Sequence, residues 1–144
     1  MAAAAGNIVG LEEQGEQLKI SSKPNALVLF NPVFDNGPDG YGYERIGERY
    51  PEISPLHNIT ADAPPTIVFL GTEDPLIPVA TAKLYQQKME AVGSRCDLHL
   101  YEGQPHGFFN YTRSPEHYFK TVRAADVFLA SLGYLQGEPT IQEP

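Results

Sequence analysis

The sequence lacks the features that mark disulfide-rich, membrane-spanning or nucleic-acid-binding proteins. Cys96 is the only cysteine, which excludes an intrachain disulfide and favours a reducing compartment such as the cytoplasm. Every apolar run is far shorter than the roughly 20 residues that a membrane-spanning helix needs, and the stretch 1–10 lacks the basic start of a signal peptide. The 10 Lys and Arg residues are scattered among 18 Asp and Glu residues, so the net charge of −8 argues against nucleic acid as a partner.

Two further missing patterns limit the chemistry. No two histidines or carboxylates have the spacing of zinc ligands on one helix, and no glycine-rich phosphate loop opens a helix. We therefore expect neither a metal nor a cofactor. The composition is that of a globular protein: 42% of the residues are hydrophobic and 19% are charged, over a length of 144 residues that suits one domain.

Strand-like and helix-like segments alternate along the chain. The runs 25–33 and 66–74 are continuously apolar, and 97–103 alternates between apolar and polar residues, so all three are predicted to be strands. Apolar residues at helical spacing predict helices over 78–93 and 115–132. This order is typical of an α/β fold in which helices cover both faces of a parallel sheet of about three strands.

The remaining segments have weaker patterns. The Ala-rich beginning of the chain predicts a helix within 1–12 that exposes an apolar face. The segment 34–65 is rich in proline and glycine, with short helical hints. We expect the domain to span 1–133 and the polar residues 134–144 to form a flexible tail.

Asp74 and His106 lie in the loops that follow the second and third predicted strands. A single aspartate or histidine in such a loop is usually a turn or capping residue. The carboxyl ends of parallel strands meet at one edge of the sheet, however, where a carboxylate can bind one nitrogen of an imidazole. The other nitrogen is then free to act as a base. The pair is therefore a candidate for two members of a hydrolytic triad.

The residues around this pair carry a resemblance to a known family. The stretch 64–111 resembles the α/β-hydrolase fold, in the esterase and lipase branch of the acetyl esterases, hormone-sensitive lipase and the prolyl-oligopeptidase-like enzymes. The acid turn is matched by "GTEDPLIP" (71–78), and the histidine turn by "HGF" (106–108). The resemblance implies a three-layer αβα architecture, a carboxylic ester as substrate, Asp74 as the catalytic acid and His106 as the catalytic base.

The sequence departs from that family in one decisive respect, since it contains no G-x-S-x-G nucleophile elbow. None of its serines has that context: Ser21, Ser22, Ser54, Ser94, Ser114 and Ser131. The stretch 1–10 resembles the helix that follows the elbow, so the resemblance covers only the C-terminal half of the fold. We therefore expect an esterase fragment that is inactive alone. Two alternatives remain open: a non-catalytic binding or assembly module with the same fold, and an unrelated flavodoxin-like or Rossmann-like domain.

Three further expectations follow. Tyr41, Tyr43 and Tyr50 precede the acid strand and are candidates to line an acyl or alcohol pocket. In the complete fold the strand 25–30 would pair with the strand that enters the elbow, so in this chain it should present an exposed edge through which a homodimer forms. Among the other histidines, His57 is interpreted as a hydrogen-bonding loop residue, His99 as a structural residue and His117 as a solvated surface residue.

Overall fold

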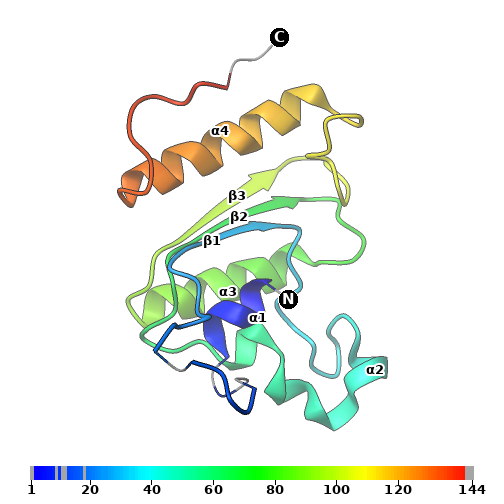
Figure 1. Ribbon diagram of the computed structural model, residues 1–144. Coiled ribbons are helices and arrows are strands. Elements are labelled where there is room, and N and C mark those ends of the chain that lie inside the picture. Colours follow the sequence, from blue (N-terminus) through cyan, green and yellow to red (C-terminus); the bar gives the residue numbers. More distant parts are fainter. Residues whose placement is uncertain (1, 9, 11–12, 18, 142–144) are drawn as a thin grey trace.

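Three strands form one parallel sheet at the centre of the structure (Figure 1). The computed structural model describes residues 2–8, 10, 13–17 and 19–141. The strands are β1 (Leu27–Phe30), β2 (Thr66–Gly71) and β3 (Cys96–Tyr101), and β2 lies in the middle. Thr66 is opposite Leu27 on one side and opposite Cys96 on the other, so the three strands begin at a common level and end at a common edge.

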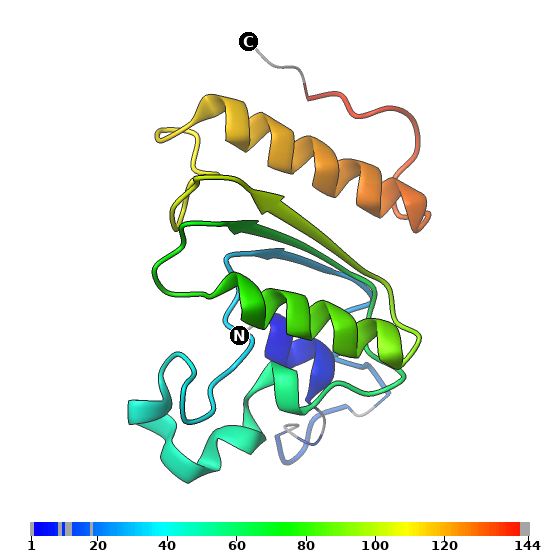
Figure 2. The same cartoon turned by 180° about the vertical axis from the view of Figure 1, so that it is seen from behind.

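Helices cover both faces of this sheet. α1 (Ala2–Asn7) and α3 (Val79–Ala91) lie on one face, and α4 (Pro115–Ser131) lies on the other (Figures 1 and 2). The side chains of β2 divide between the two layers because successive residues of a strand point to opposite faces. Val68 and Leu70 join the core beneath α3, whereas Ile67 and Phe69 join the core beneath α4. The predicted three-layer arrangement with three parallel strands is therefore confirmed.

The strands are shorter than the apolar runs that predict them. β1 ends at Phe30 because Asn31 has φ 44°, a left-handed conformation that cannot continue a strand. β3 ends at Tyr101, and the chain turns at Gly103, where φ is 68°. β1 and β3 therefore stop where the chain enters a loop, and these loops begin earlier in the sequence than predicted.

The N-terminal helix differs most from the expectation. α1 ends at Asn7, so the helix predicted within 1–12 is wrong in its extent; residues 9, 11 and 12 of that prediction lie outside the described residues. One side of α1 is covered, because Ala3 and Gly6 are buried against β1, whereas Ala2 and Ala5 are exposed. A Cβ atom at Gly6 would lie 2.7 Å from the Cδ1 atom of Leu27, so a larger residue would require the Leu27 side chain to move.

The segment between β1 and β2 contains only short helices, in agreement with its proline and glycine content. They are α2 (Tyr43–Ile46) and the 3-10 helices η1 (Gly47–Glu52) and η2 (Pro55–His57). Residues 134–141 form neither helix nor strand, and 142–144 lie outside the described residues. In the described part of the chain, no helix has both the length and the apolar character that crossing a bilayer requires.

Gly71 is the last residue of β2, and the backbone of the loop that follows β3 passes very close to it. A Cβ atom at this position would lie 2.0 Å from the carbonyl oxygen of Gln104. We expect Gly71→Ala to reduce the free energy of unfolding by about 3 kcal/mol, because a backbone atom cannot move aside cheaply. Urea denaturation measures this loss.

Gly93→Ala is the matched control. Gly93 has φ 83° and no atom within 4 Å of an added Cβ, so its substitution should cost only the backbone strain, about 1 kcal/mol. Equal losses in the two variants would contradict the close approach at Gly71.

Candidate active site

The structure brings Asp74 and His106 into direct contact. Asp74 follows β2 and His106 follows β3, so both lie at the carboxyl edge of the sheet, on the right in Figure 1. The Nδ1 atom of His106 is 2.8 Å from the Oδ2 atom of Asp74. The carboxylate is completely buried, whereas the imidazole is 42% exposed. The contact that the sequence leads us to expect is present, and the catalytic roles of the two residues stay a prediction.

The Asp74 carboxylate accepts hydrogen bonds on both of its oxygens. Oδ1 accepts the backbone N–H groups of Leu76 and Ile77, at 2.8 and 3.2 Å. Oδ2 accepts the side-chain amide of Asn31 at 2.7 Å in addition to the imidazole of His106. Four donors thus compensate the carboxylate for its burial. Asp74 forms the turn typical of a loop aspartate with one oxygen and presents the other to His106.

The turn that carries His106 is held by its backbone conformation, by hydrogen bonds to its carbonyl oxygens and by one buried side chain. Gly107 has φ 76°, which glycine adopts without strain, and its carbonyl oxygen accepts the Asn110 amide at 2.9 Å. Arg113 donates to the carbonyl oxygen of His106 at 2.6 Å. Phe108 is buried beneath α4. The loop is therefore fixed through its backbone and through Phe108, while the imidazole projects from it.

This geometry defines what the pair can do chemically. A carboxylate oxygen only accepts hydrogen bonds, so the Nδ1 atom of His106 is the donor in the contact with Asp74. The neutral imidazole then carries no proton on Nε2, which can accept one from a substrate or a nucleophile. Asp74 also stabilises the imidazolium ion that forms when Nε2 is protonated.

Asn31 is the site residue that the sequence does not reveal. The loop after the first strand lies at the same sheet edge, but its residues match no catalytic motif. In the structure Asn31 is buried, and its side chain contacts Asp74 and the backbone of Gly107. The only signal in the sequence is the Asn-Pro pair at the end of an apolar run, which indicates a turn and not a site.

Ser54 and His57 form a serine–histidine pair, but its arrangement is not catalytic. Ser54 is completely buried, and its hydroxyl oxygen is 2.9 Å from Nδ1 of His57. The nearest carboxylate, that of Asp35, is 3.9 Å from the same nitrogen. A catalytic histidine contacts its acid and its serine through opposite nitrogens. The pair therefore organises the loop, as predicted for His57.

Ser114 and His117 form another serine–histidine pair, which also has a structural role. Ser114 is the N-cap of α4 and accepts the backbone N–H of His117 at 3.3 Å. The imidazole lies 2.8 Å from the same hydroxyl and packs edge-on against Phe108 and Tyr101. His117 is thus half-buried, and its interpretation as a solvated surface residue is wrong.

Of the three tyrosines that are candidates to line a pocket, only Tyr41 lines one beside the acid loop. A cavity of about 180 Å³ opens beside the acid loop and is lined by Val33, Phe34, Asp35, Asp39, Gly40, Tyr41, Leu76, Ile77, Pro78 and Thr81. Tyr43 and Tyr50 do not line it. Their rings pack against each other with centroids 6.1 Å apart, and Tyr50 also meets His57 edge-on.

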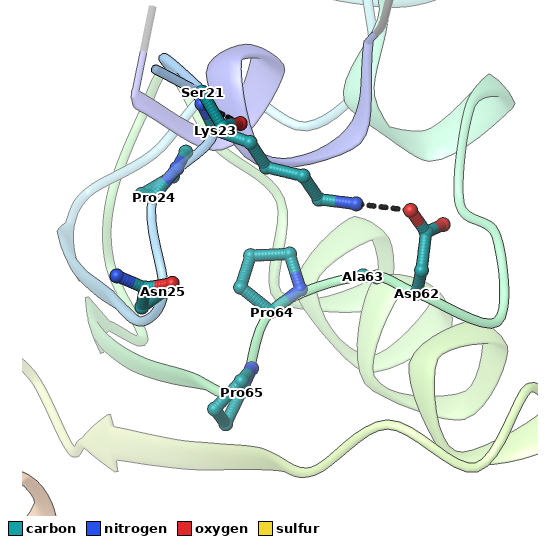
Figure 3. A pocket seen from close by; sticks show the side chains of 8 residues that line it. All are labelled: Ser21, Lys23, Pro24, Asn25, Asp62, Ala63, Pro64 and Pro65. Atoms are coloured by element: carbon teal, nitrogen blue, oxygen red, sulfur yellow. Dashed lines mark hydrogen bonds and ion pairs between the residues drawn. The ribbon is translucent and has the colours of Figure 1, made fainter. Parts of the chain in front are cut away.

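A larger pocket lies at the opposite end of the sheet (Figure 3). Its volume is about 360 Å³, and it is lined by Ser21, Lys23, Pro24, Asn25, Asp62, Ala63, Pro64 and Pro65. Lys23 forms an ion pair with Asp62 and is the main reason that the pKa of this carboxyl falls to about 2. The residues precede β1 and β2, so the pocket is remote from His106. Among the described residues, no group of three or more His, Cys, Asp or Glu side chains could hold a metal ion.

Sequence comparisons connect this geometry with known hydrolases. A family model described as the alpha/beta hydrolase fold matches residues 41–110, which include both Asp74 and His106. Esterase LipC of Mycobacterium tuberculosis is 37% identical over 71 residues, which are 45% of this chain and 17% of that protein.

Solved structures match nearly all of this chain. Esterase 2 of Thermogutta terrifontis, phosphorylated by paraoxon, is 39% identical with a TM-score of 0.85, over 94% of this chain and 51% of that one. The propionate-bound form is 36% identical with a TM-score of 0.83, over 95% of this chain and 53% of that one. The chain therefore spans about half the length of the solved esterases that it matches.

The four donors around Asp74 generate a prediction for stability. Asp74→Asn replaces one acceptor oxygen with an NH₂ group that faces donors, so at least one buried donor loses its partner whichever way the amide turns. We expect a loss of about 3 kcal/mol in the free energy of unfolding. Asp97→Asn is the control: its ion pair with Arg95 lies at the surface, and it should cost about 0.5 kcal/mol. Similar losses would contradict the buried network.

Proposed function

The chain belongs to the α/β-hydrolase esterases and spans about half of their fold, and from this we propose that it supplies the acid and the base of a serine carboxylic-ester hydrolase. Asp74 is the proposed acid and His106 the proposed base. The nucleophilic serine would come from a segment outside these 144 residues, in the same polypeptide or in another. The observation that supports this proposal most strongly is the contact between Asp74 and Nδ1 of His106, which leaves Nε2 available.

The proposed reaction uses both nitrogens of His106 in turn. Nε2 accepts the proton of the serine hydroxyl as its oxygen attacks the ester carbonyl, and Asp74 stabilises the resulting imidazolium. The imidazolium then gives this proton to the departing alcohol. Water hydrolyses the acyl-enzyme by the same two proton transfers, which regenerate the serine.

The proposed reaction also needs a nucleophilic serine and an oxyanion site in addition to Asp74 and His106. Within the described residues, His106 contacts the Asp74 carboxylate but no serine hydroxyl. Backbone N–H groups that stabilise the oxyanion contribute about 3 kcal/mol each in serine hydrolases, and these too would have to come from the other half. Base catalysis without a nucleophile or an oxyanion site gives little rate, so the chain alone should be almost inactive.

The substrate is proposed to be an ester with a short acyl chain. Esterase 2 of Thermogutta terrifontis has been solved with propionate bound and with butyrate bound. In this chain the small cavity beside the acid loop is bounded by Tyr41, Leu76 and Ile77. Its position next to Asp74 makes it a candidate to hold the acyl or alcohol portion of such an ester.

The open edge of β1 is proposed to be the surface through which the chain assembles. Leu27 and Asn31 direct their N–H groups to β2, so the alternate residues Val28 and Phe30 direct theirs away from the sheet. The faces of β1 are largely covered, since the side chains of Leu27 and Leu29 are buried and the other two are half-buried. The open surface is thus the backbone edge, not the faces of the strand.

An apolar groove beside this edge extends the proposed assembly surface. Its volume is about 490 Å³, and it is lined by Phe30, Phe109, Asn110, Tyr111, Thr112, Tyr118, Thr121 and Val122. A complementary half of the esterase fold would cover the edge and the groove together. In its absence we propose that a second copy of the chain does so, as a homodimer that continues the sheet. This surface also supports the second candidate function, a non-catalytic assembly module.

Restoring the missing half tests the catalytic proposal. The chain alone should hydrolyse p-nitrophenyl butyrate only marginally above the buffer rate. Joined to the half of Thermogutta terrifontis esterase 2 that it does not cover, it should hydrolyse the ester readily. His106→Ala in that chimaera should reduce kcat by about 10³-fold or more. A folded chimaera that has no activity, or whose activity does not depend on His106, would favour the assembly module.

Light scattering over a dilution series tests the homodimer. We expect a concentration-dependent dimer that Tyr111→Lys weakens about tenfold, because a charge on the rim of the groove must then be desolvated. Tyr134→Lys is the matched control, since Tyr134 is 54% exposed, as Tyr111 is at 53%, but does not line the groove. A monomer at every concentration, or equal effects of the two lysines, would contradict this surface.

A further inference from the structure

We propose that Asn31 is a positioning residue that fixes the orientation of the Asp74 carboxylate and the His106 loop relative to each other. Asn31 is the first residue after β1, and only 7% of its surface is exposed. Its side chain donates to Oδ2 of Asp74 at 2.7 Å and accepts the backbone N–H of Gly107 at 3.1 Å. One amide thus connects the loops that follow all three strands.

The backbone of Asn31 is adapted to this position. Its φ of 44° is the only positive value among the non-glycine residues that the structure describes. Asparagine tolerates this conformation better than most residues, although it still costs free energy. The backbone N–H of Asn31 donates to the carbonyl oxygen of Phe69 at 3.0 Å, which continues the β1–β2 ladder by one bond. The left-handed turn therefore starts from a fixed point and directs the side chain into the site.

The two partners of the amide determine its orientation. The Asp74 carboxylate only accepts hydrogen bonds, and the N–H of Gly107 only donates one. The NH₂ group must therefore face Asp74 and the amide oxygen must face Gly107. No other side chain of this size offers a donor and an acceptor in these two places: aspartate lacks the donor and leucine lacks both.

The consequence for His106 is indirect but specific. Oδ2 of Asp74 receives both the Asn31 amide and Nδ1 of His106, so the amide holds this oxygen where the imidazole needs it. The bond to Gly107 fixes the residue that follows His106 in the chain. Asn31 should therefore stabilise the tautomer of His106 that carries its proton on Nδ1 and leaves Nε2 free. The catalytic meaning of this role rests on the proposed function, but the tautomer itself does not.

The test is a measurement of the His106 tautomer by ¹⁵N NMR on the full 144-residue chain. In the unsubstituted chain the Nδ1–H form should dominate. Asn31→Gly keeps the left-handed backbone and removes both hydrogen bonds, and it should lower the ratio of the Nδ1–H to the Nε2–H form about fivefold. Asn31→Asp keeps the size, the turn preference and the acceptor for Gly107 but loses the donor to Asp74, and it should lower the ratio at least as much. Asn58→Gly, which removes an amide that bonds only to the carbonyl oxygens of Pro51 and Ser54, is the control and should leave the ratio unchanged.

The outcomes separate this inference from the proposed function. An unchanged tautomer ratio in folded Asn31→Gly, or in Asn31→Asp should the glycine variant not fold, would overturn the positioning role. A shift in both variants supports that role even if the esterase chimaera has no activity. In an active chimaera, Asn31→Gly should lower kcat and leave KM almost unchanged, because Asn31 acts through Asp74 and does not contact the substrate.

Discussion

The burial of the Asp74 carboxylate constrains the whole carboxyl edge of the sheet. A completely buried anion needs a donor for each of its lone-pair directions, and here the donors come from separate segments: the turn after Pro75, the amide of Asn31 and the imidazole of His106. Each donor fixes the segment that carries it. The loops after the three strands therefore form a rigid unit around one charge, and Gly71 allows the last of them to approach closely enough.

A half-fold can be stable when its faces are covered, even if one edge of the sheet is not. α1 packs on β1 through Gly6, and α3 and α4 cover the rest of the sheet. Among the described residues no strand pairs with the outer side of β1, where the Val28 and Phe30 amides point away from β2. An unpaired backbone edge beside an apolar groove is satisfied best by another strand, whereas water satisfies only the backbone groups. The proposed assembly would supply such a strand.

The sequence predicts the parts of this structure that depend on local patterns. Continuous apolar runs identify β1 and β2, because a strand that is buried on both faces is apolar at every position. Helical spacing identifies α3 and α4, because a helix that is buried on one side has apolar residues at intervals of three and four. Asp74 and His106 can be found because each belongs to a motif beside a strand. Asn31 cannot, since its role depends on contacts with residues 43 and 76 positions away. The half-buried state of His117 is missed for the same reason, since it depends on packing against Tyr101 and Phe108 in other segments.

Asp74 and His106 differ in how far the fold itself needs them. One oxygen of Asp74 closes the turn at Leu76 and Ile77, so the carboxylate would be required even in a protein without catalysis. The loop of His106 is held by the carbonyl of His106, by Gly107 and by Phe108, and none of these contacts uses the imidazole. The imidazole has one strong polar contact and is 42% exposed. The fold therefore uses the ring of His106 only as one of the four donors to Asp74, whereas Asp74 also closes its own turn. The exposed part of the ring has no such structural task, so the presence of His106 carries more weight for chemistry than the presence of Asp74.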